Sequence, residues 1–326
     1  MSLTPGQSLL HYELIEHPEG GNGPPLDERA FGPGPLLTQR ALDWIGAHRA
    51  KRPDVPFFAY LHYMEPHAPY LCGPQAAEAC ERRAVELNRE LLALGWRLSP
   101  RRQKFLSRLY DAGVARMDAV LAELRRGLEA EGLLDRIWLV VVADHGELLG
   151  EGGLYMHGRS LGEPLVHVPL LIRGPGIRPG VVDTPVSIMD VAPTLLDLVG
   201  VGAPQSFRGR SLRPALEGRS LAVRPVVAEL FQEGEAPDPR QQHVLAIVDG
   251  TDKYLVRTDG TVERYDLAAD PQERSPLATD PVRFAELLAE LGLEANPARY
   301  LGAPKTRPTP ETLEALRKLG YLAPAQ

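Results

Sequence analysis

The hydrophobic pattern of this 326-residue chain alternates between helix-like and strand-like segments. Apolar positions at helical spacing predict a short amphipathic helix over Thr38–Arg49 and a long helix from Ser99 to Gly132. Ser99 offers an N-cap, and Pro100 occupies the first helical position, where proline costs no hydrogen bond. Between these helices, the aromatic-rich apolar run Pro56–Tyr63 predicts a buried strand.

Two further apolar runs follow the long helix. Arg136–Ala143 and Val168–Gly174 are rich in branched aliphatic residues and lack polar alternation, as is typical of central strands in a parallel sheet. Helices that alternate with such strands indicate an α/β/α sandwich with a mostly parallel sheet and short right-handed crossovers.

The two ends of the chain have sequence patterns that differ from that of the middle. Residues 1–37 are rich in Gly and Pro and show no periodicity, which predicts an irregular N-terminal segment. After about residue 218, short alternating strands are separated by Asp-Gly turn signals, and helical segments follow near Pro281–Leu291 and Pro310–Leu319. We therefore expect an α/β domain over 38–217 and a C-terminal α+β subdomain, with an antiparallel sheet, over 218–326.

Composition excludes some functions. The formal net charge of −7 provides no basic face for nucleic acid, so we expect no nucleic-acid partner. No run approaches the ~18 apolar residues of a membrane span. Cys72 and Cys80, the two cysteines, fit either two free thiols or one disulfide that staples a loop.

The strongest chemical signal is Asp144-His145-Gly146, at the end of the run Arg136–Ala143. Open α/β sheets bind ligands at the carboxyl ends of their strands. A carboxylate beside an imidazole at such an edge supplies two ligands for a divalent cation, and Gly146 permits a tight turn. The alternative is an N-cap aspartate beside a surface histidine.

The segment Ala143–Gly176, "ADHGELLGEGGLYMHGRSLGEPLVHVPLLIRGPG", closely resembles the sulfatases of the alkaline phosphatase superfamily. "PFFAYLHYMEPHAPY" at Pro56–Tyr70 is similar to that family's strand ending in HxPY. Further blocks resemble the family in the same order, "LYDAGVARMDAVLAEL", "TPVSIMDVAPTLLDLVGV", "RYDLAADPQE" and "LRKLGYL", so the resemblance runs from about Thr38 to the end.

The resemblance implies roles for four residues. Asp144 and His145 match two protein ligands of the catalytic metal, which would be calcium, with manganese, magnesium or zinc in phosphoester-cleaving relatives. His67 matches a histidine that contacts the sulfate or phosphate group and helps to protonate the leaving oxygen, and His157 lies where relatives place a histidine or lysine over the same anion. As alternatives, His67 could rigidify a turn and His157 could cap a helix. Glu147 fits a solvated or supporting carboxylate better than a metal ligand.

One family feature is missing from the sequence. Relatives carry an aspartate-ended strand and then C/S-x-P-x-R, whose cysteine or serine becomes the formylglycine nucleophile. Neither block occurs here, and Cys72 is rejected as the nucleophile because Ala76 stands where arginine is required. The expectation is therefore a C-terminal portion of a longer enzyme, which binds metal weakly, is inactive alone and self-associates through an uncovered sheet edge.

Two classes of function follow. The first is metal-dependent hydrolysis of sulfate esters, small molecules or glycans, with phosphate or phosphonate ester hydrolysis or phosphoglycerol transfer as variants. The second is a non-catalytic relative that binds an anion or a partner protein. The resemblance implies a periplasmic or extracellular location.

Overall fold

The computed structural model describes residues 34–73, 77–93, 98–230 and 243–293. The chain divides into two compact units. The first, called here the helical unit, contains the described residues up to Ile137 together with Gly152–Tyr155; the second, the sheet unit, contains the remainder. The predicted helix Pro310–Leu319 lies outside the described residues, and the predicted boundary at residue 217 stays a prediction.

The helical unit is built from α1 (Gly34–Lys51), α2 (Glu78–Ala93) and α3 (Pro100–Ala130). Its core is aliphatic, with Ala41 and Ile45 from α1, Leu87 and Leu91 from α2, and Leu106, Val120, Leu124 and Leu128 from α3, among others. These positions recur every three or four residues, so each helix buries one face. The predicted long helix is confirmed, with Ser99 at its N-cap and Pro100 in its first turn.

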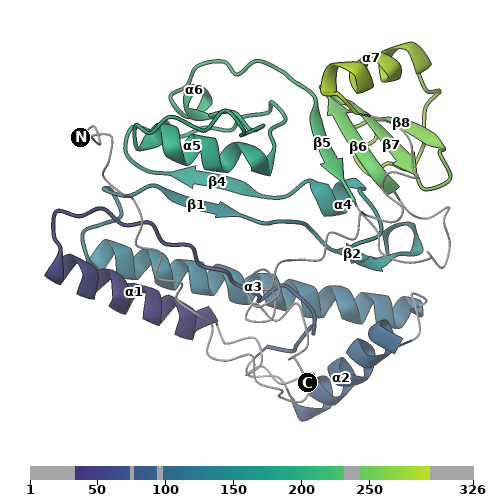
Figure 1. The fold of residues 1–326 in the computed structure, drawn as a ribbon. Helices are drawn as coiled ribbons and strands as arrows, with labels where there is room; N and C mark the ends of the chain where they lie inside the picture. Colours follow the sequence, from purple (N-terminus) through teal and green to yellow (C-terminus); the bar gives the residue numbers. More distant parts are fainter. Residues whose placement is uncertain (1–33, 74–76, 94–97, 231–242, 294–326) are drawn as a thin grey trace, which may run out of the picture. The chain divides into compact units, whose positions relative to one another are not determined.

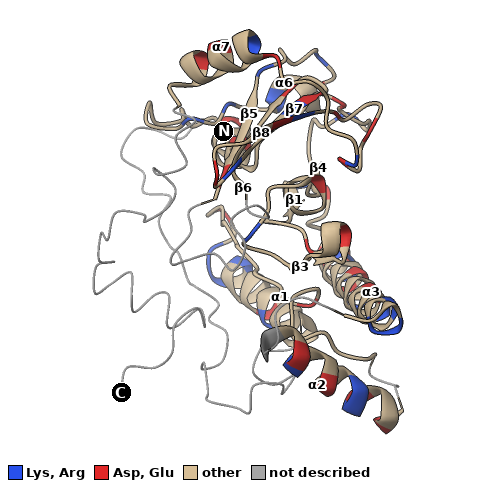
Figure 2. Ribbon diagram, turned by 90° about the vertical axis from the view of Figure 1, so that its right-hand side faces the viewer, with Lys and Arg blue, Asp and Glu red and all other residues tan. Residues whose placement is uncertain are grey.

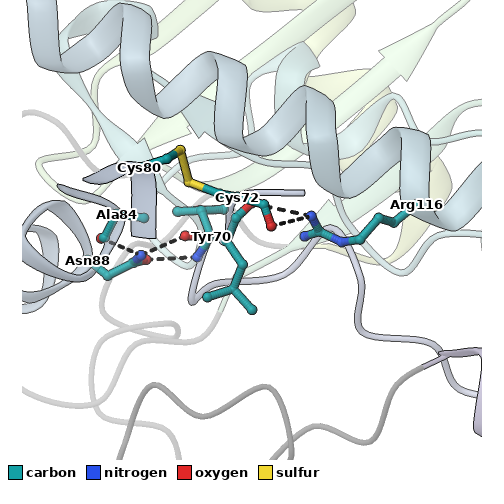
Figure 3. Close-up of a disulfide and its surroundings, with 7 residues drawn as sticks. Tyr70, Cys72, Cys80, Ala84, Asn88 and Arg116 are labelled. Carbon is teal, nitrogen blue, oxygen red and sulfur yellow. Dashed lines mark hydrogen bonds between the residues drawn. A yellow bond between two sulfur atoms is a disulfide. The ribbon is translucent and has the colours of Figure 1, made fainter. Parts of the chain in front are cut away.

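The segment between α1 and α2 corrects one prediction. Residues 56–63 form no strand, and Phe58 and Tyr60 are exposed. A strand requires hydrogen-bonding partners, and no strand among the described residues pairs with this run. Further along the segment, a disulfide joins Cys72 to Cys80 and decides between the two alternatives for these cysteines (Figure 3).

The sheet unit begins with β1 (Leu139–Val142), which pairs with β4 (Leu170–Arg173) (Figure 1). Between them lie the two-residue strands β2 (Leu148–Leu149) and β3 (Tyr155–Met156), the 3-10 turn η2 (Glu151–Gly153) and the one-turn helix α4 (Glu163–Val166). Strands were predicted at both β1 and β4, and both are confirmed.

Their direction differs from the prediction, because β1 and β4 are antiparallel. A parallel pair needs a crossover of a dozen or more residues, usually a full helix, that carries the chain back to the start of the first strand. Here the connection contains a small hairpin and the four residues of α4, which do not form such a crossover.

After β4 the chain forms η3 (Ile188–Asp190), α5 (Val191–Leu198) and α6 (Arg213–Leu216). It then forms an antiparallel sheet in the order β5 (Val226–Glu229), β6 (His243–Asp249), β7 (Asp252–Arg257) and β8 (Val262–Asp266). The helix α7 (Pro281–Leu291) packs Phe284 and Leu287 onto this sheet (Figure 1). The predicted C-terminal meander and its first helix are therefore confirmed.

Candidate active site

The Asp144-His145-Gly146 turn leaves the carboxyl end of β1, as the sequence predicted. The side chain of Asp144 is 70% exposed and that of His145 is 40% exposed, so both are available to a ligand. His145 Nε2 lies 3.8 Å from Asp144 Oδ2, close enough for one ion to bond to both at roughly 2.0–2.2 Å.

The hydrogen bond of His145 determines which ring nitrogen faces a ligand. Nδ1 of His145 lies 2.9 Å from the carbonyl oxygen of Gly146. Because a carbonyl can only accept, Nδ1 carries the proton, and in the neutral ring Nε2 keeps a lone pair for a metal ion. This is the tautomer that a metal-binding histidine needs.

Gly146 is required by a close backbone approach. Its N–H donates to the Leu165 carbonyl at 2.8 Å, and a Cβ at this position would lie 2.0 Å from the Pro164 carbonyl oxygen. Any larger residue would push the turn away from α4.

His157 lies beside the turn, directly after β3. Its ring centroid is 4.1 Å from that of His145, and its Nδ1 donates to Glu147 Oε1 at 3.0 Å. The side chain of Glu147 is 5% exposed, which rules out the solvated alternative and leaves the supporting one. The hydrogen bond to Glu147 raises the pKa of His157, while burial opposes the rise. His157 is therefore biased towards the cationic form, which suits an anionic ligand.

The residues after His157 are attached to the C-terminal sheet. His243 Nδ1, at the start of β6, lies 3.1 Å from Ser160 Oγ and accepts the Leu161 N–H at 3.3 Å. The N–H of His243 donates to the Arg159 carbonyl at 3.3 Å. We call residues 159–163 the anchoring segment.

A buried cluster of ion pairs holds Glu163, the C-terminal residue of the anchoring segment. Lys253 of β7 is fully buried, and its Nζ lies 2.7 Å from Glu163 Oε1 and 2.7 Å from Glu273 Oε1. The other oxygen of Glu273 accepts the Glu163 N–H at 2.7 Å. The C-terminal sheet therefore holds the anchoring segment, which begins two residues after His157.

The four predicted site residues fall into two groups. Asp144, His145 and His157 come together in the sheet unit, whereas His67 belongs to the helical unit. There, the His67 N–H donates to the Met64 carbonyl, and the Glu65 carbonyl lies so near Gly113 of α3 that a Cβ on this glycine would be 2.8 Å from it. The segment that carries His67 thus packs closely on α3.

The described residues could supply only part of the coordination shell of a metal ion. Among the residues that the structure describes, no group of three or more His, Cys, Asp or Glu side chains could hold an ion. Asp144 and His145 provide two donors of suitable chemistry, one carboxylate and one imidazole. Within the same ranges, no helix is long and apolar enough to cross a bilayer.

The sequence left Glu147 between two roles and gave no indication of three other residues that support the site, His243, Lys253 and Glu273. One signal could have revealed the buried ion pairs, namely a lysine within the apolar run of β7. Lysine is almost never fully buried without a partner, so Lys253 predicts a buried acidic group. The identity of its partners could not be found from that signal, because Glu163 is 90 residues away in the sequence.

Comparison with known proteins identifies the family of the chain. The family model described as "Sulfatase" matches residues 19–201, and "N-sulphoglucosamine sulphohydrolase, C-terminal" matches residues 150–297. The choline-sulfatase of Rhizobium meliloti is 35% identical over 183 residues, which are 53% of this chain and 33% of the relative. The chain therefore spans about a third of that relative's length.

Solved structures share the fold. The phosphonate monoester hydrolase of Agrobacterium radiobacter has a TM-score of 0.59 at 24% identity, covering 79% of this chain and 58% of that one. A protein solved in complex with its substrate, D-glucosamine-2-N,6-O-disulfate, has a TM-score of 0.56 at 19% identity, covering 90% and 71%. The fold is thus the α/β fold of the alkaline phosphatase superfamily, and the chain belongs to the sulfatase family.

Proposed function

We propose that this chain provides the metal and anion site of a sulfuric ester hydrolase. The observation that carries the proposal is the group Asp144, His145 and His157, in which the buried Glu147 carboxylate supports a positive charge on His157. An ester sulfate has a charged tetrahedral group whose oxygens need cationic or donor groups in the transition state. The imidazolium of His157 would bind one of these oxygens.

The remaining roles come from the family resemblance. Asp144 and His145 would hold one divalent ion, which supplies charge neutralisation to the ester oxygens when it is bound. His67 would contact the same anion and donate a proton to the leaving oxygen. No residue of this sequence matches the C/S-x-P-x-R nucleophile, so we propose that the chain binds metal and anion without turnover by itself.

The donor atoms of Asp144 and His145 favour some divalent metals over others. The resemblance favours calcium, but calcium takes oxygen ligands, whereas an imidazole nitrogen suits zinc and a carboxylate suits manganese. The tautomer of His145 leaves Nε2 available, so we propose manganese or zinc ahead of calcium or magnesium. The same donors would serve phosphate or phosphonate esters, which remain the second candidate substrates.

The test is direct binding to this chain. Isothermal titration with Mn²⁺, Zn²⁺, Ca²⁺ and Mg²⁺ should show weak binding that Asp144→Asn or His145→Ala abolishes. His167→Ala is the matched control, because its side chain is 81% exposed and outside the group. Unchanged metal binding in Asp144→Asn would contradict the assignment.

The anion part needs a separate measurement. Inorganic sulfate and methylphosphonate should each shift the His157 ring resonances in NMR spectra, and the tighter ligand indicates the ester class. Hydrolysis of 4-nitrophenyl sulfate by this chain should stay at the background rate, and clear turnover would show that the nucleophile has been overlooked. Metal and anion binding without any ester selectivity would favour the non-catalytic alternative.

The disulfide supports a proposal for the compartment. A Cys72–Cys80 bond persists in oxidising surroundings and is rare in the cytosol. We therefore propose a periplasmic or extracellular location. Thiol titration of the protein isolated without reductant should find no reactive cysteine, and two free thiols would contradict this assignment.

A further inference from the structure

A cavity of about 440 Å³ lies between α2 and the first turns of α3, within the helical unit. We call it the α2–α3 pocket. Cys72 and Cys80 both line it, so a small molecule in the pocket would lie against their disulfide. The other lining residues include an apolar row and four cations, namely Phe105, Leu109 and Ala112, and Arg83, Arg101, Lys104 and Arg108.

The two cysteines of the disulfide differ in access. Cys72 is 6% exposed, whereas Cys80, in the first turn of α2, is only partly buried. Thiol–disulfide exchange begins when a thiolate attacks one of the two sulfurs, and its rate depends on access to that sulfur. Cys80 is therefore the sulfur to be attacked, and Cys72 is the sulfur that leaves.

The segment that carries Cys72 is held by bonds other than the disulfide (Figure 3). Asn88 of α2 is buried and exchanges two hydrogen bonds, each of 2.8 Å, with the backbone of Tyr70. Arg116 donates to the carbonyls of Leu71 and Cys72 at 3.3 Å. These bonds do not need the S–S bond, so Cys72 would stay in the pocket wall after the disulfide opens.

The α2–α3 pocket is positively charged, although the whole chain carries a formal charge of −7. Arg101, Lys104 and Arg108 are three or four residues apart and form one row on α3. Among the described residues, none of these three has an acidic side chain at ion-pair distance, whereas the neighbouring Arg102 pairs with Glu90. Figure 2 shows Lys and Arg at the near end of α3.

The fourth cation lies close to Cys80 on the same helix. Arg83 is three residues after Cys80, so the two side chains are neighbours on one face of α2, and its guanidinium lies 4.6 Å from the centroid of Phe105. Glu78 and Glu81 also belong to the first turn of α2, but neither lines the pocket, and Glu78 pairs with Arg82.

Cationic surroundings promote exchange in two ways. Neighbouring Lys and Arg side chains stabilise a cysteine thiolate, and a disulfide opens faster when the leaving sulfur forms a stable thiolate. A concave site of one charge also raises the local concentration of molecules with the opposite charge. A thiolate that carries a carboxylate would gain from both effects.

We propose that the Cys72–Cys80 disulfide is an exchange site for small thiols that carry a carboxylate. The thiolate attacks Cys80 Sγ, a new S–S bond forms there, the Cys72–Cys80 bond breaks, and its electron pair stays on Cys72 Sγ as a thiolate. The product is a mixed disulfide at Cys80, and the step consumes one thiolate and generates another. This reactivity is separate from the proposed hydrolase function and does not depend on it.

The experiment compares three thiols of different charge, 3-mercaptopropionate, 2-mercaptoethanol and cysteamine, at equal thiolate concentration. Quenching with N-ethylmaleimide and mass spectrometry of the peptides give the initial rate and the modified cysteine. Each rate is divided by the rate with the urea-unfolded chain, which removes differences in intrinsic reactivity. 3-Mercaptopropionate should then react about 10-fold or more faster than cysteamine. The mixed disulfide should be on Cys80, with the maleimide on Cys72.

Variants of α3 test the role of the cations. Arg101→Gln/Arg108→Gln should reduce the preference for 3-mercaptopropionate by about threefold or more, and Arg101→Lys/Arg108→Lys should keep it. Arg125→Gln/Arg126→Gln is the matched control, because it removes the same charge from the other end of α3, outside the pocket, and should leave the preference within about twofold.

A salt titration of the wild type keeps the test independent of how the variants fold. The preference should largely disappear at about 1 M salt, where charges are screened beyond about 3 Å. Equal corrected rates for the three thiols, or the same preference in the glutamine and lysine variants, would overturn the proposal. A mixed disulfide on Cys72 would refute the assignment of Cys80 as the attacked sulfur.

Discussion

His145 and His157 have adjacent rings but opposite hydrogen-bond partners. A carbonyl accepts from His145, so its Nε2 can act as a neutral ligand, whereas a buried carboxylate accepts from His157 and favours its cation. Two histidines of one small group thus present different hydrogen-bonding environments, and that of His157 raises the pKa of its ring. The two acceptors belong to neighbouring residues in the turn that follows β1. His145 bonds to the backbone carbonyl of Gly146, and His157 bonds to the side-chain carboxylate of Glu147.

Gly146 offers a test of the turn. We expect Gly146→Ala to lower the stability by about 1–3 kcal/mol, because the new Cβ would meet the Pro164 carbonyl and force the backbone apart. Metal binding at Asp144 and His145 should weaken in the same variant. Chemical denaturation measures the first effect, and Gly180→Ala is the control because a Cβ there meets nothing within 4 Å. Equal stability of the two variants would contradict the close approach.

His243 should make stability depend on pH. Burial, together with the charges of Arg257 and Lys253, lowers the pKa of His243 to about 3, against 6.5 in the unfolded chain. Between these values only the unfolded state binds the proton, so stability is complete above about pH 6.5 and falls as the pH decreases. The expected loss is about 1.4 kcal/mol per pH unit.

The measurement compares wild type with His243→Gln in denaturant titrations from pH 7 to pH 4. Glutamine lacks the titrating group, so the difference between the two proteins isolates His243 from the carboxylates. Parallel pH profiles would show that folding does not lower the pKa of His243.

The sequence could predict Asp144, His145 and His157 because they are close together in the chain and carry the family pattern. Glu147 was left between two roles, because the choice depends on the β2–β3 hairpin that brings residues 147 and 157 together. Hairpin strands of two residues leave almost no periodic signal.

At the scale of elements, the Lys253 cluster connects α4, β7 and the loop after β8. We expect Lys253→Met to lower the free energy of unfolding by about 3–5 kcal/mol, because two carboxylates that are 15% and 8% exposed lose their counter-charge. Chemical denaturation with urea measures this loss.

The triple variant Lys253→Met/Glu163→Gln/Glu273→Gln provides the control. Removing both carboxylate charges should recover a large part of the stability, since neutral amides are less costly to bury. If the triple variant is no more stable than Lys253→Met, the loss comes from packing and not from charge.

The disulfide fastens α2 to the segment before it. We expect Cys72→Ser/Cys80→Ser to lower stability by about 2–3 kcal/mol, because the bond closes a short loop, with the cysteines 8 residues apart. Thermal unfolding of wild type with and without reductant should reproduce the shift. No effect of reductant on the wild type, with a destabilised double variant, would indicate side-chain packing instead.

A helix could be predicted well where capping residues or proline mark its start. Ser99 and Pro100 begin α3, and that helix was predicted from them. The helix near Pro281–Leu291 was also predicted, and in the structure Asp280 accepts from two amides at the start of α7. Pairing could not be predicted in the same way. The run 56–63 has a strand-like composition without a described partner, and the direction of β4 depends on the length of α4, which the apolar pattern does not encode.

For the whole molecule, the β1–β4 pair bears on self-association. Among the described residues it is a two-stranded sheet, so each strand keeps an outer edge, and Leu171 is 60% exposed. We expect concentration-dependent association in sedimentation velocity, reduced by Leu171→Lys. Val181→Lys is the control, since Val181 is 88% exposed and outside the strands. A monomer at all concentrations would contradict this expectation.

The anchoring segment also limits how such proteins can exchange parts. A chimera joined at residue 217 would pair a foreign sheet with the native Arg159–Glu163, and its equivalents of His243 and Lys253 would have to match partners they had not evolved with. The hydrogen bonds and ion pairs that hold the anchoring segment would then form only if the two parental sequences happened to be compatible. A workable crossover point therefore lies before Asp144, so that recombination transfers Glu147, His157, the anchoring segment and the C-terminal sheet together.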